Sequence, residues 1–155
     1  MKIDVTLEIT PKMVQDAQGH DKKSLSGHLG THFDVMNKEF PLEYTQRRGI
    51  VFDVSGIKDR DIGVFDVDLE KVPADELIEK LVDLHISLIG VDFAGIRRGR
   101  EHPVKDQYCA NHGVFVIENM CNLKELLNKD VIMNTYPMRY QGMTGLPCRV
   151  VAETM

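Results

Sequence analysis

The sequence predicts an α/β domain, and its patterning in two regions indicates this class. Residues 2–9 alternate between apolar and polar side chains and are rich in β-branched types, which is typical of a half-buried strand. Residues 73–83 have the pattern of an amphipathic helix, and the apolar run at 86–93 predicts a buried strand directly after it. A helix between strands favours an α/β architecture. At 155 residues the chain is long enough for one hydrophobic core, so we expect a single domain over residues 1–155.

The first half of the chain is expected to contain short strands separated by loops. Residues 11–26 are polar and predict a loop that leads to the segment beginning at Gly27. Residues 40–44 predict a turn or short helix, and the continuous apolar run at 49–54 predicts a buried strand. Residues 61–70 lead to a helix start or turn that is rich in acids, and because these acids lack the spacing of a calcium-binding loop we interpret them as a solvated face.

The second half begins with the clearest helix. Pro73 suits a first helical turn, acids favour the same end, and Leu77, Ile78, Leu81 and Val82 form one apolar stripe. The remaining elements are expected as a strand at 86–93, a helix at 103–112 ended by Gly113, a strand at 114–118, a short helix at 123–127, and strands at 131–133 and 149–152.

A loop at residues 95–100 carries Arg97, Arg98 and Arg100 between glycines. Such a run is able to bind an anionic substrate. Arginines near glycines are more often part of a solvated loop, and we favour that interpretation.

Composition narrows the function classes. The formal net charge is −5, which argues against a nucleic acid or an anionic membrane as the main partner. No stretch approaches 18 apolar residues, and the first residues do not resemble a signal peptide. The three cysteines, Cys109, Cys121 and Cys148, have no C-x-x-C spacing. We expect them to be reduced and the protein to be cytoplasmic.

The strongest chemical signal lies in residues 27–38, where His28, His32 and Asp34 fall within seven positions. On an ideal strand all three side chains share a face, but the two histidines would be roughly 13 Å apart at about 3.3 Å per residue. Metal bonds of about 2.0–2.2 Å do not span that distance. A bend at Gly30 would bring the imidazoles together, with His32 and Asp34 on the inward face of a short strand. These ligand types suit a first-row divalent cation.

Two histidines four residues apart are, in most soluble chains, surface or simply hydrogen-bonded residues, and this alternative stays open on spacing alone. Glu118 adds a second observation, because it closes the apolar run at 114–117. A buried carboxylate needs a partner.

Together these segments resemble the cyclase family of metal-dependent hydrolases, which includes bacterial kynurenine formamidase and isatin hydrolase. The family's motif His-x-Gly-Thr-His-x-Asp-x-Pro-x-His is matched at His28, Gly30, Thr31, His32 and Asp34. Its Ile-x-Ile-Val-Glu-Asn-Leu-x-Asn-Leu run is similar to residues 114–123, and its C-terminal Gly-x-x-Gly-x-Pro-x-Arg pattern is similar to residues 142–149.

The resemblance implies a swivelling β/β/α fold, a homodimer or larger homo-oligomer, and a site for one or two divalent metals, zinc or manganese. By that mapping the ligands are His28, His32, Asp34, Asp106 and Glu118. The implied activity is hydrolysis of a small amide, formamide or cyclic amide, in which metal-activated water attacks a carbonyl.

The sequence departs from the family pattern at three positions. Met36 replaces the motif's proline, Lys38 replaces its catalytic histidine, and Asp106 replaces the usual histidine of the second metal position. The chain is also shorter than the usual member. A carboxylate remains a ligand and shifts preference from zinc toward manganese or magnesium. His102, one helical turn earlier, is a substitute ligand for the second position, whereas His85 and His112 are interpreted as structural.

Lys38 leaves two functional interpretations. Nearby dications would lower its pKa and allow it to act as a base, or it would stabilise an oxyanion as a fixed cation, and we assign it as the catalytic residue on that basis. The first interpretation is therefore a metal-dependent hydrolase of a small molecule. The alternative is a non-catalytic or regulatory metal- or ligand-binding module on the same fold.

Overall fold

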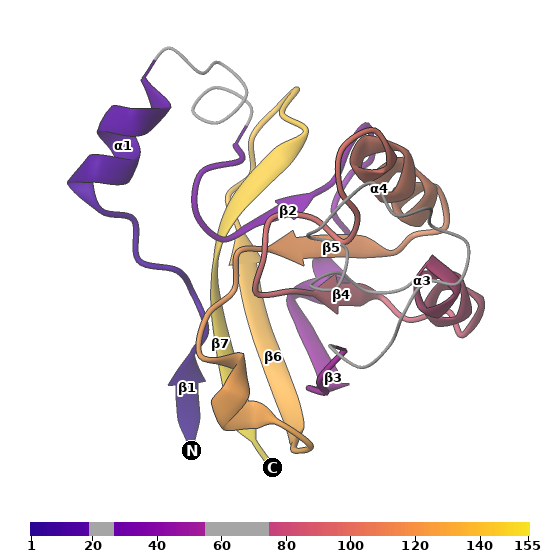
Figure 1. Ribbon diagram of the computed structural model, residues 1–155. Coiled ribbons are helices and arrows are strands. Elements are labelled where there is room, and N and C mark those ends of the chain that lie inside the picture. Colours follow the sequence, from indigo (N-terminus) through magenta and orange to yellow (C-terminus); the bar gives the residue numbers. More distant parts are fainter. Residues whose placement is uncertain (19–26, 55–74) are drawn as a thin grey trace.

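A computed structural model describes residues 1–18, 27–54 and 75–155 of the chain. The described part contains helices and strands in mixed order, as expected for the α/β class (Figure 1). None of the described helices is long and apolar enough to span a membrane. The elements are β1 (Lys2–Asp4), α1 (Pro11–Ala17), β2 (His32–Asp34), the 3₁₀ helix η1 (Leu42–Thr45), β3 (Gln46–Ile50), α3 (Asp75–Asp83), β4 (Leu88–Gly90), α4 (Glu101–Asn111), β5 (Phe115–Glu118), the 3₁₀ helix η3 (Leu123–Leu126), β6 (Asp130–Pro137) and β7 (Gly145–Thr154).

One curled sheet links all the strands, in the order β3-β6-β7-β2-β5-β4, with β1 added to β7. The strands pair antiparallel except for β4 and β5, which are parallel. The long strand β7 connects two parts of the sheet, because its first residues pair with β2 and its later residues pair with β1 and β6. Helices α3 and α4 lie together on one side of β4 and β5 (Figure 1).

Two apolar clusters hold the sheet from opposite faces. One contains Phe33, Phe115 and Ile117 together with residues of β1, β6 and β7. The other contains Val116 together with Ile78 of α3 and Cys109 of α4. Strand β5 is therefore buried on both faces, and its alternating side chains serve a different cluster on each. The face that carries Val116 also carries Glu118, and it is covered by α4.

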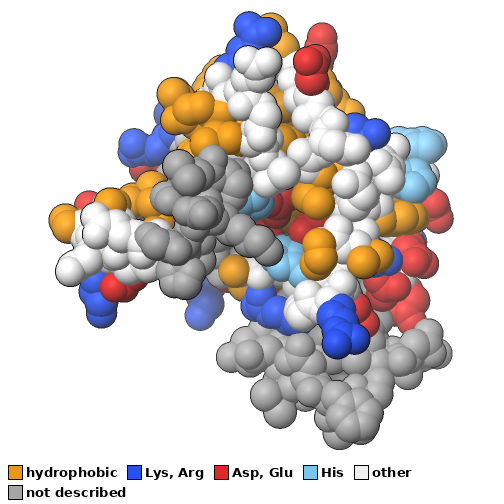
Figure 2. All heavy atoms as spheres, turned by 90° about the horizontal axis from the view of Figure 1, so that it is seen from above, with side chains coloured by type: hydrophobic (Ala, Val, Ile, Leu, Met, Phe, Trp, Pro, Cys, Tyr) orange, Lys and Arg blue, Asp and Glu red, His pale blue; other side chains and the backbone are white. Residues whose placement is uncertain are grey.

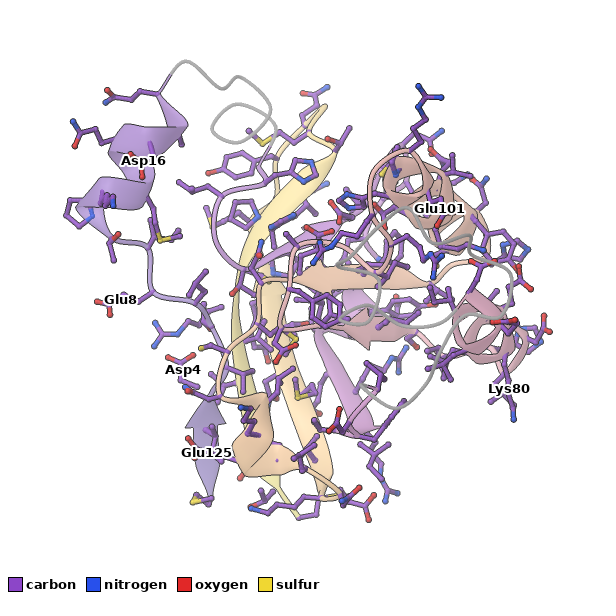
Figure 3. All side chains as sticks on the ribbon, viewed as in Figure 1. Asp4, Glu8, Asp16, Lys80, Glu101 and Glu125 are labelled. Carbon is purple, nitrogen blue, oxygen red and sulfur yellow. The ribbon has the colours of Figure 1, made fainter. Side chains whose placement is uncertain are left out.

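Most elements expected from the sequence are confirmed, including the helix at α3, whose first expected residues lie outside the described part of the chain. The turn or short helix after residue 40 is η1. The expected turn at 61–70 and residues 19–26 of the expected loop also lie outside the described residues. The side chain of Lys80 on α3 points away from the sheet (Figure 3).

Three expectations are wrong. Residues 11–17 form helix α1 and not a loop, because the Thr10 side chain accepts a hydrogen bond from Met13 N–H and a proline begins the helix. The strand expected to be buried at 49–54 is β3, which lies earlier in the chain at the edge of the sheet, and Ile50 is exposed. Arg97 is not in a solvated loop: it is 2% exposed and contacts Glu101 through Nε at 2.9 Å.

Candidate metal centre

Strand β2 places two side chains of the expected site on one face of the sheet. His32 and Asp34 lie two residues apart and flank Phe33, which points into the opposite apolar cluster. In the antiparallel register His32 lies opposite Glu118 of β5. Residues directly opposite in such a pair share a face, so Glu118 joins the other two under α4. His32 Nε2 lies 3.5 Å from Asp34 Oδ1 and 3.4 Å from Glu118 Oε2.

His28 reaches the same place from an irregular segment before β2. Gly27 and Gly30 have φ angles of +80° and +71°, a region that favours glycine, and they turn the chain back on itself. His28 Nδ1 consequently lies 3.0 Å from His32 Nε2 and 3.0 Å from Asp34 Oδ1. The bend predicted at Gly30 is thus present, and the distance that excluded an ideal strand is removed.

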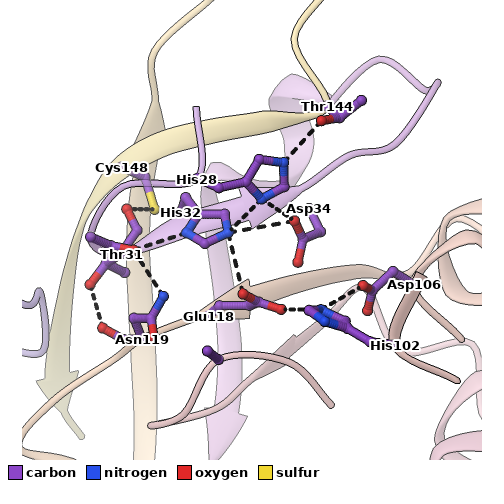
Figure 4. A network of polar contacts seen from close by, with 12 residues as sticks. His28, Thr31, His32, Asp34, His102, Asp106, Glu118, Asn119, Thr144 and Cys148 are labelled. Atoms are coloured by element: carbon purple, nitrogen blue, oxygen red, sulfur yellow. Dashed lines mark hydrogen bonds and ion pairs between the residues drawn. The ribbon is translucent and has the colours of Figure 1, made fainter. Parts of the chain in front are cut away.

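Helix α4 adds Asp106 and His102 from above the sheet. The two residues are one helical turn apart, and His102 Nε2 lies 3.0 Å from Asp106 Oδ2. The same nitrogen lies 2.8 Å from Glu118 Oε1, so the helix and the strand meet at this imidazole (Figure 4).

Neighbouring hydrogen bonds fix the orientation of the two imidazoles on the β2 side. The Gly30 carbonyl lies 2.9 Å from His32 Nδ1 and also accepts a hydrogen bond from Asn119 Nδ2. Thr144 Oγ1 lies 2.9 Å from His28 Nε2. These contacts leave His32 Nε2 and His28 Nδ1 facing the carboxylates, as is typical of metal-ligating histidines.

The carboxylates and imidazoles strongly perturb one another. Burial disfavours the charged form of His32, but hydrogen bonds with Asp34 and Glu118 outweigh burial and raise its pKa to about 10. Asp106 and then Glu118 raise the pKa of His102 to about 10 as well. Burial raises the pKa of Asp106 to about 6. Burial also opposes ionisation of Asp34, yet its hydrogen bonds with His28 and His32 hold its pKa well below the usual range. Without a metal ion, the protonated His32 and His102 carry the positive charge that offsets the buried carboxylates, and a bound divalent cation would take over that role.

The donor set fits divalent cations. The potential ligand atoms form two groups, and within each group all atoms lie within 4.8 Å of one another. The first group consists of His28, His32 and Asp34, and the second consists of Asp34, His102, Asp106 and Glu118. Asp34 Oδ2 and Asp106 Oδ1 are buried and have no hydrogen-bond partner among the described residues. Buried polar atoms are nearly always satisfied, so these two oxygens are available to a cation that lies between the groups.

The cluster is open to solvent on one side. The side chain of His28 is 27% exposed and that of His102 is 34% exposed, whereas His32 is buried. Figure 2 shows histidine and acidic side chains at the bottom of a hollow bordered by apolar side chains. Solvent therefore reaches the cluster at the exposed edges of these two imidazoles.

The structure brings together the five residues predicted as metal ligands, and His102, the expected substitute ligand, lies beside Asp34, Asp106 and Glu118. The spacing of four residues to Asp106 on a predicted helix was the signal for His102. Lys38 lies apart from this cluster: it is exposed in the turn that follows β2, and its backbone N–H donates to the Val35 carbonyl. His112 contacts the Tyr108 carbonyl at 2.8 Å and takes no part in the cluster.

Comparisons with known proteins gave matches only among solved structures, since no family model and no curated protein matches the chain. A structure described as a potential metal-dependent hydrolase with cyclase activity superposes with a TM-score of 0.72 and 22% identity, covering 98% of this chain and 96% of that one. A predicted metal-dependent hydrolase from Bacillus stearothermophilus gives 0.70 and 20%, covering 98% and 97%. Isatin hydrolase A from Labrenzia aggregata gives 0.64 and 18%, covering 98% and 93%.

The chain has the cyclase-type hydrolase fold. The resemblance inferred from the sequence is thereby confirmed at the level of the fold, and the present chain spans nearly the full length of the first two structures. Within the cyclase-type fold the candidate ligands come from the bend before β2, from β2 itself, from β5 and from α4.

Proposed function

We propose that this protein is a metal-dependent hydrolase that acts on a small amide, formamide or cyclic amide. One observation carries the proposal: three carboxylates, Asp34, Asp106 and Glu118, are each at most 4% exposed and converge on one point, with two of their oxygens unpartnered. Burying like charges together is strongly unfavourable unless positive charge compensates them. Imidazoles alone leave two of these oxygens without a partner, whereas a metal ion would coordinate them.

The residues divide into two metal positions. His28, His32 and Asp34 would hold a first cation, and Asp34, Asp106 and Glu118 would contribute to a second. Nitrogen and carboxylate ligands of this kind suit zinc or manganese. Such a cation, when bound, lowers the pKa of a water molecule and polarises a carbonyl oxygen, which is the chemistry that amide hydrolysis needs at neutral pH.

The protein's own residues supply orientation and access. The Gly30 carbonyl and Thr144 hold His32 and His28 so that one nitrogen of each faces the cluster. The exposed edges of His28 and His102 define the side from which a substrate enters. The proposed substrate class is supported by a structural neighbour that is named isatin hydrolase.

Lys38 is kept as the proposed proton-transfer residue, but its position favours a second candidate function. It is exposed, and within the described residues its side chain makes no hydrogen bond or ion pair with the cluster. A protein that keeps the ligands but holds no base beside them would bind a metal or ligand without turnover. This non-catalytic binding module is the alternative. A Lys38→His variant distinguishes it from the hydrolase, because a gain of hydrolytic activity in the variant would indicate that the native protein lacks a catalytic base.

The test is metal analysis followed by an activity screen with formamides, lactams and cyclic imides in the presence of Mn²⁺ or Zn²⁺. We expect stoichiometric metal and hydrolysis of at least one class. Asp34→Asn should lose both, because this carboxylate is shared by the two positions. The matched control is Asp16→Asn, whose carboxylate lies on α1 far from the cluster (Figure 3). Native protein with neither metal nor turnover contradicts the proposal, and native protein with metal but no turnover favours the binding module.

A homodimer or larger homo-oligomer is also proposed, from the family resemblance. Sedimentation or light scattering of the purified protein measures the subunit number directly.

A further inference from the structure

The cluster contains one imidazole more than the two on the β2 side, and it lies on α4. His102 Nε2 points at two carboxylates from different elements, at 3.0 Å from Asp106 Oδ2 and 2.8 Å from Glu118 Oε1. A nitrogen within 3 Å of both oxygens occupies the place of a further donor around a common centre. Asp34 belongs to the same group of ligand atoms, all within 4.8 Å of one another.

The backbone beside α4 leaves space for this ring. Gly95 has a φ of +105°, and a Cβ at this position would lie 2.7 Å from His102 Nε2 and 2.9 Å from its Cε1. Any larger residue at Gly95 would displace the imidazole from the carboxylates. The space that holds the ring is thus created by the one residue type that tolerates both the backbone angle and the contact.

A second observation indicates that the arrangement awaits a cation. Asp106 is 4% exposed, and its Oδ1 has no partner among the described residues although its Oδ2 contacts His102. Asp34 Oδ2, on strand β2, is likewise buried and has no hydrogen-bond partner among the described residues. An imidazole that served only to neutralise these acids would leave both oxygens unsatisfied, whereas a cation would satisfy them.

We propose that His102 is a ligand of the second metal position and that the two positions are unlike in metal preference. The second position consists of His102, Asp34, Asp106 and Glu118, which is one imidazole with three carboxylates. The first consists of His28, His32 and Asp34, which is two imidazoles with one carboxylate. This inference rests on the proposed metal-dependent function and specifies how its two positions differ.

The difference in donors predicts a difference in selectivity. Divalent zinc binds more tightly than manganese at most sites, but imidazole favours zinc while carboxylate favours manganese and magnesium. The zinc-over-manganese preference is therefore smaller at the second position than at the first. In protein loaded with manganese at both positions, zinc should replace the manganese of the first position before that of the second position.

The experiment uses chelator-treated full-length protein titrated with Mn²⁺ and followed by electron paramagnetic resonance and calorimetry. Wild-type protein should bind two equivalents, and one equivalent of added Zn²⁺ should displace one Mn²⁺ and leave the other bound. In His102→Gln one of the two Mn²⁺-binding steps should lose roughly 10–100-fold in affinity, while the other stays as in wild type. This is the range seen when a metal site loses supporting contacts. His112→Gln, altered just after the last residue of the same helix and outside the cluster, should bind as wild type.

Each outcome decides the matter. A wild-type protein that binds no metal refutes the proposed function and this inference together. Two bound ions with unchanged affinities in His102→Gln refute the role of His102 and leave the hydrolase proposal intact. Displacement of both Mn²⁺ ions in parallel by Zn²⁺ refutes the difference in preference.

A further measurement on unaltered protein covers the case in which His102→Gln does not fold. In nitrogen-15 spectra of histidine rings, protein loaded with two equivalents of Zn²⁺ should show His102 ligated through Nε2. A His102 ring whose signals do not change on loading overturns the assignment.

Discussion

Replacing Gly27 by alanine should destabilise the protein much more than the same change at Gly142. Both glycines have positive φ angles, +80° and +74°, so alanine pays a similar backbone penalty at each, about 1 kcal/mol. A Cβ at Gly142 meets nothing within 4 Å, whereas a Cβ at Gly27 would lie 2.0 Å from the Gly145 carbonyl oxygen. Because Cβ contacts below 3.0 Å essentially do not occur, the two segments must separate by about 1 Å.

The separation has a cost that the structure specifies. Gly145 pairs with Asp34 at the start of β7, and the preceding Thr144 carbonyl accepts hydrogen bonds from Val35 and Met36 N–H at 2.9 and 3.1 Å. Losing two such bonds costs about 2 kcal/mol, at roughly 1 kcal/mol each. We therefore expect about 3 kcal/mol for Gly27→Ala and about 1 kcal/mol for Gly142→Ala. In thermal unfolding these correspond to losses of roughly 6–12 °C and 2–4 °C.

Urea and thermal denaturation of both variants, followed by circular dichroism, provide the measurement. Metal affinity gives a second readout, because Gly27 precedes His28 and its displacement moves that imidazole away from Asp34. Equal losses of stability in the two variants would refute the argument, since the contacts with Gly145 and Pro147 distinguish Gly27 from Gly142.

Three further predictions concern charge, metal and packing. The pKa of His32 is raised from 6.5 to about 10, so in chelator-treated protein its contribution to stability is full below pH 6.5 and is lost as the pH rises through about 10; urea midpoints measured at intervals from pH 6 to 10 should fall, and midpoints that rise over this range would contradict the assignment. Removing metal from loaded protein should lower the melting temperature by about 5–10 °C, since ligand at 100 times its dissociation constant contributes about 2.7 kcal/mol; an unchanged melting curve after chelation would argue against a bound cation. Phe33→Ala should cost about 3–5 kcal/mol, because this ring is fully buried and packs 4.5 Å from the Phe40 ring; a loss below about 1 kcal/mol in denaturant unfolding would show that the cluster collapses around the cavity.

The sequence was most informative where a pattern was local. The amphipathic stripe of α3 and the apolar run that ends at Glu118 each need only neighbouring residues to be recognised, and both are confirmed. The bend before His32 was also predictable, because ligand distances are incompatible with a straight strand.

Features that depend on distant partners could not be predicted in the same way. The alternating pattern of residues 2–9 suggested one strand of eight residues, but only Lys2–Asp4 pair as strand β1 with β7. The place of His102 in the second ligand group depends on how α4 lies over β5, which spacing along the helix suggests but does not fix.

The path of the chain through the sheet has a consequence for synthesis on the ribosome. Strand β2 pairs with β5 on one side and β7 on the other, and Thr31 donates a hydrogen bond to the carbonyl of Asn119, 88 positions later. When His28, His32 and Asp34 leave the exit tunnel, none of the strands that will hold them has been made. Pairings this distant in sequence form slowly and only after their partners are available. The nascent chain thus exposes two imidazoles and a carboxylate before the residues around them are in place, and uptake of the proposed cation would belong to the end of folding.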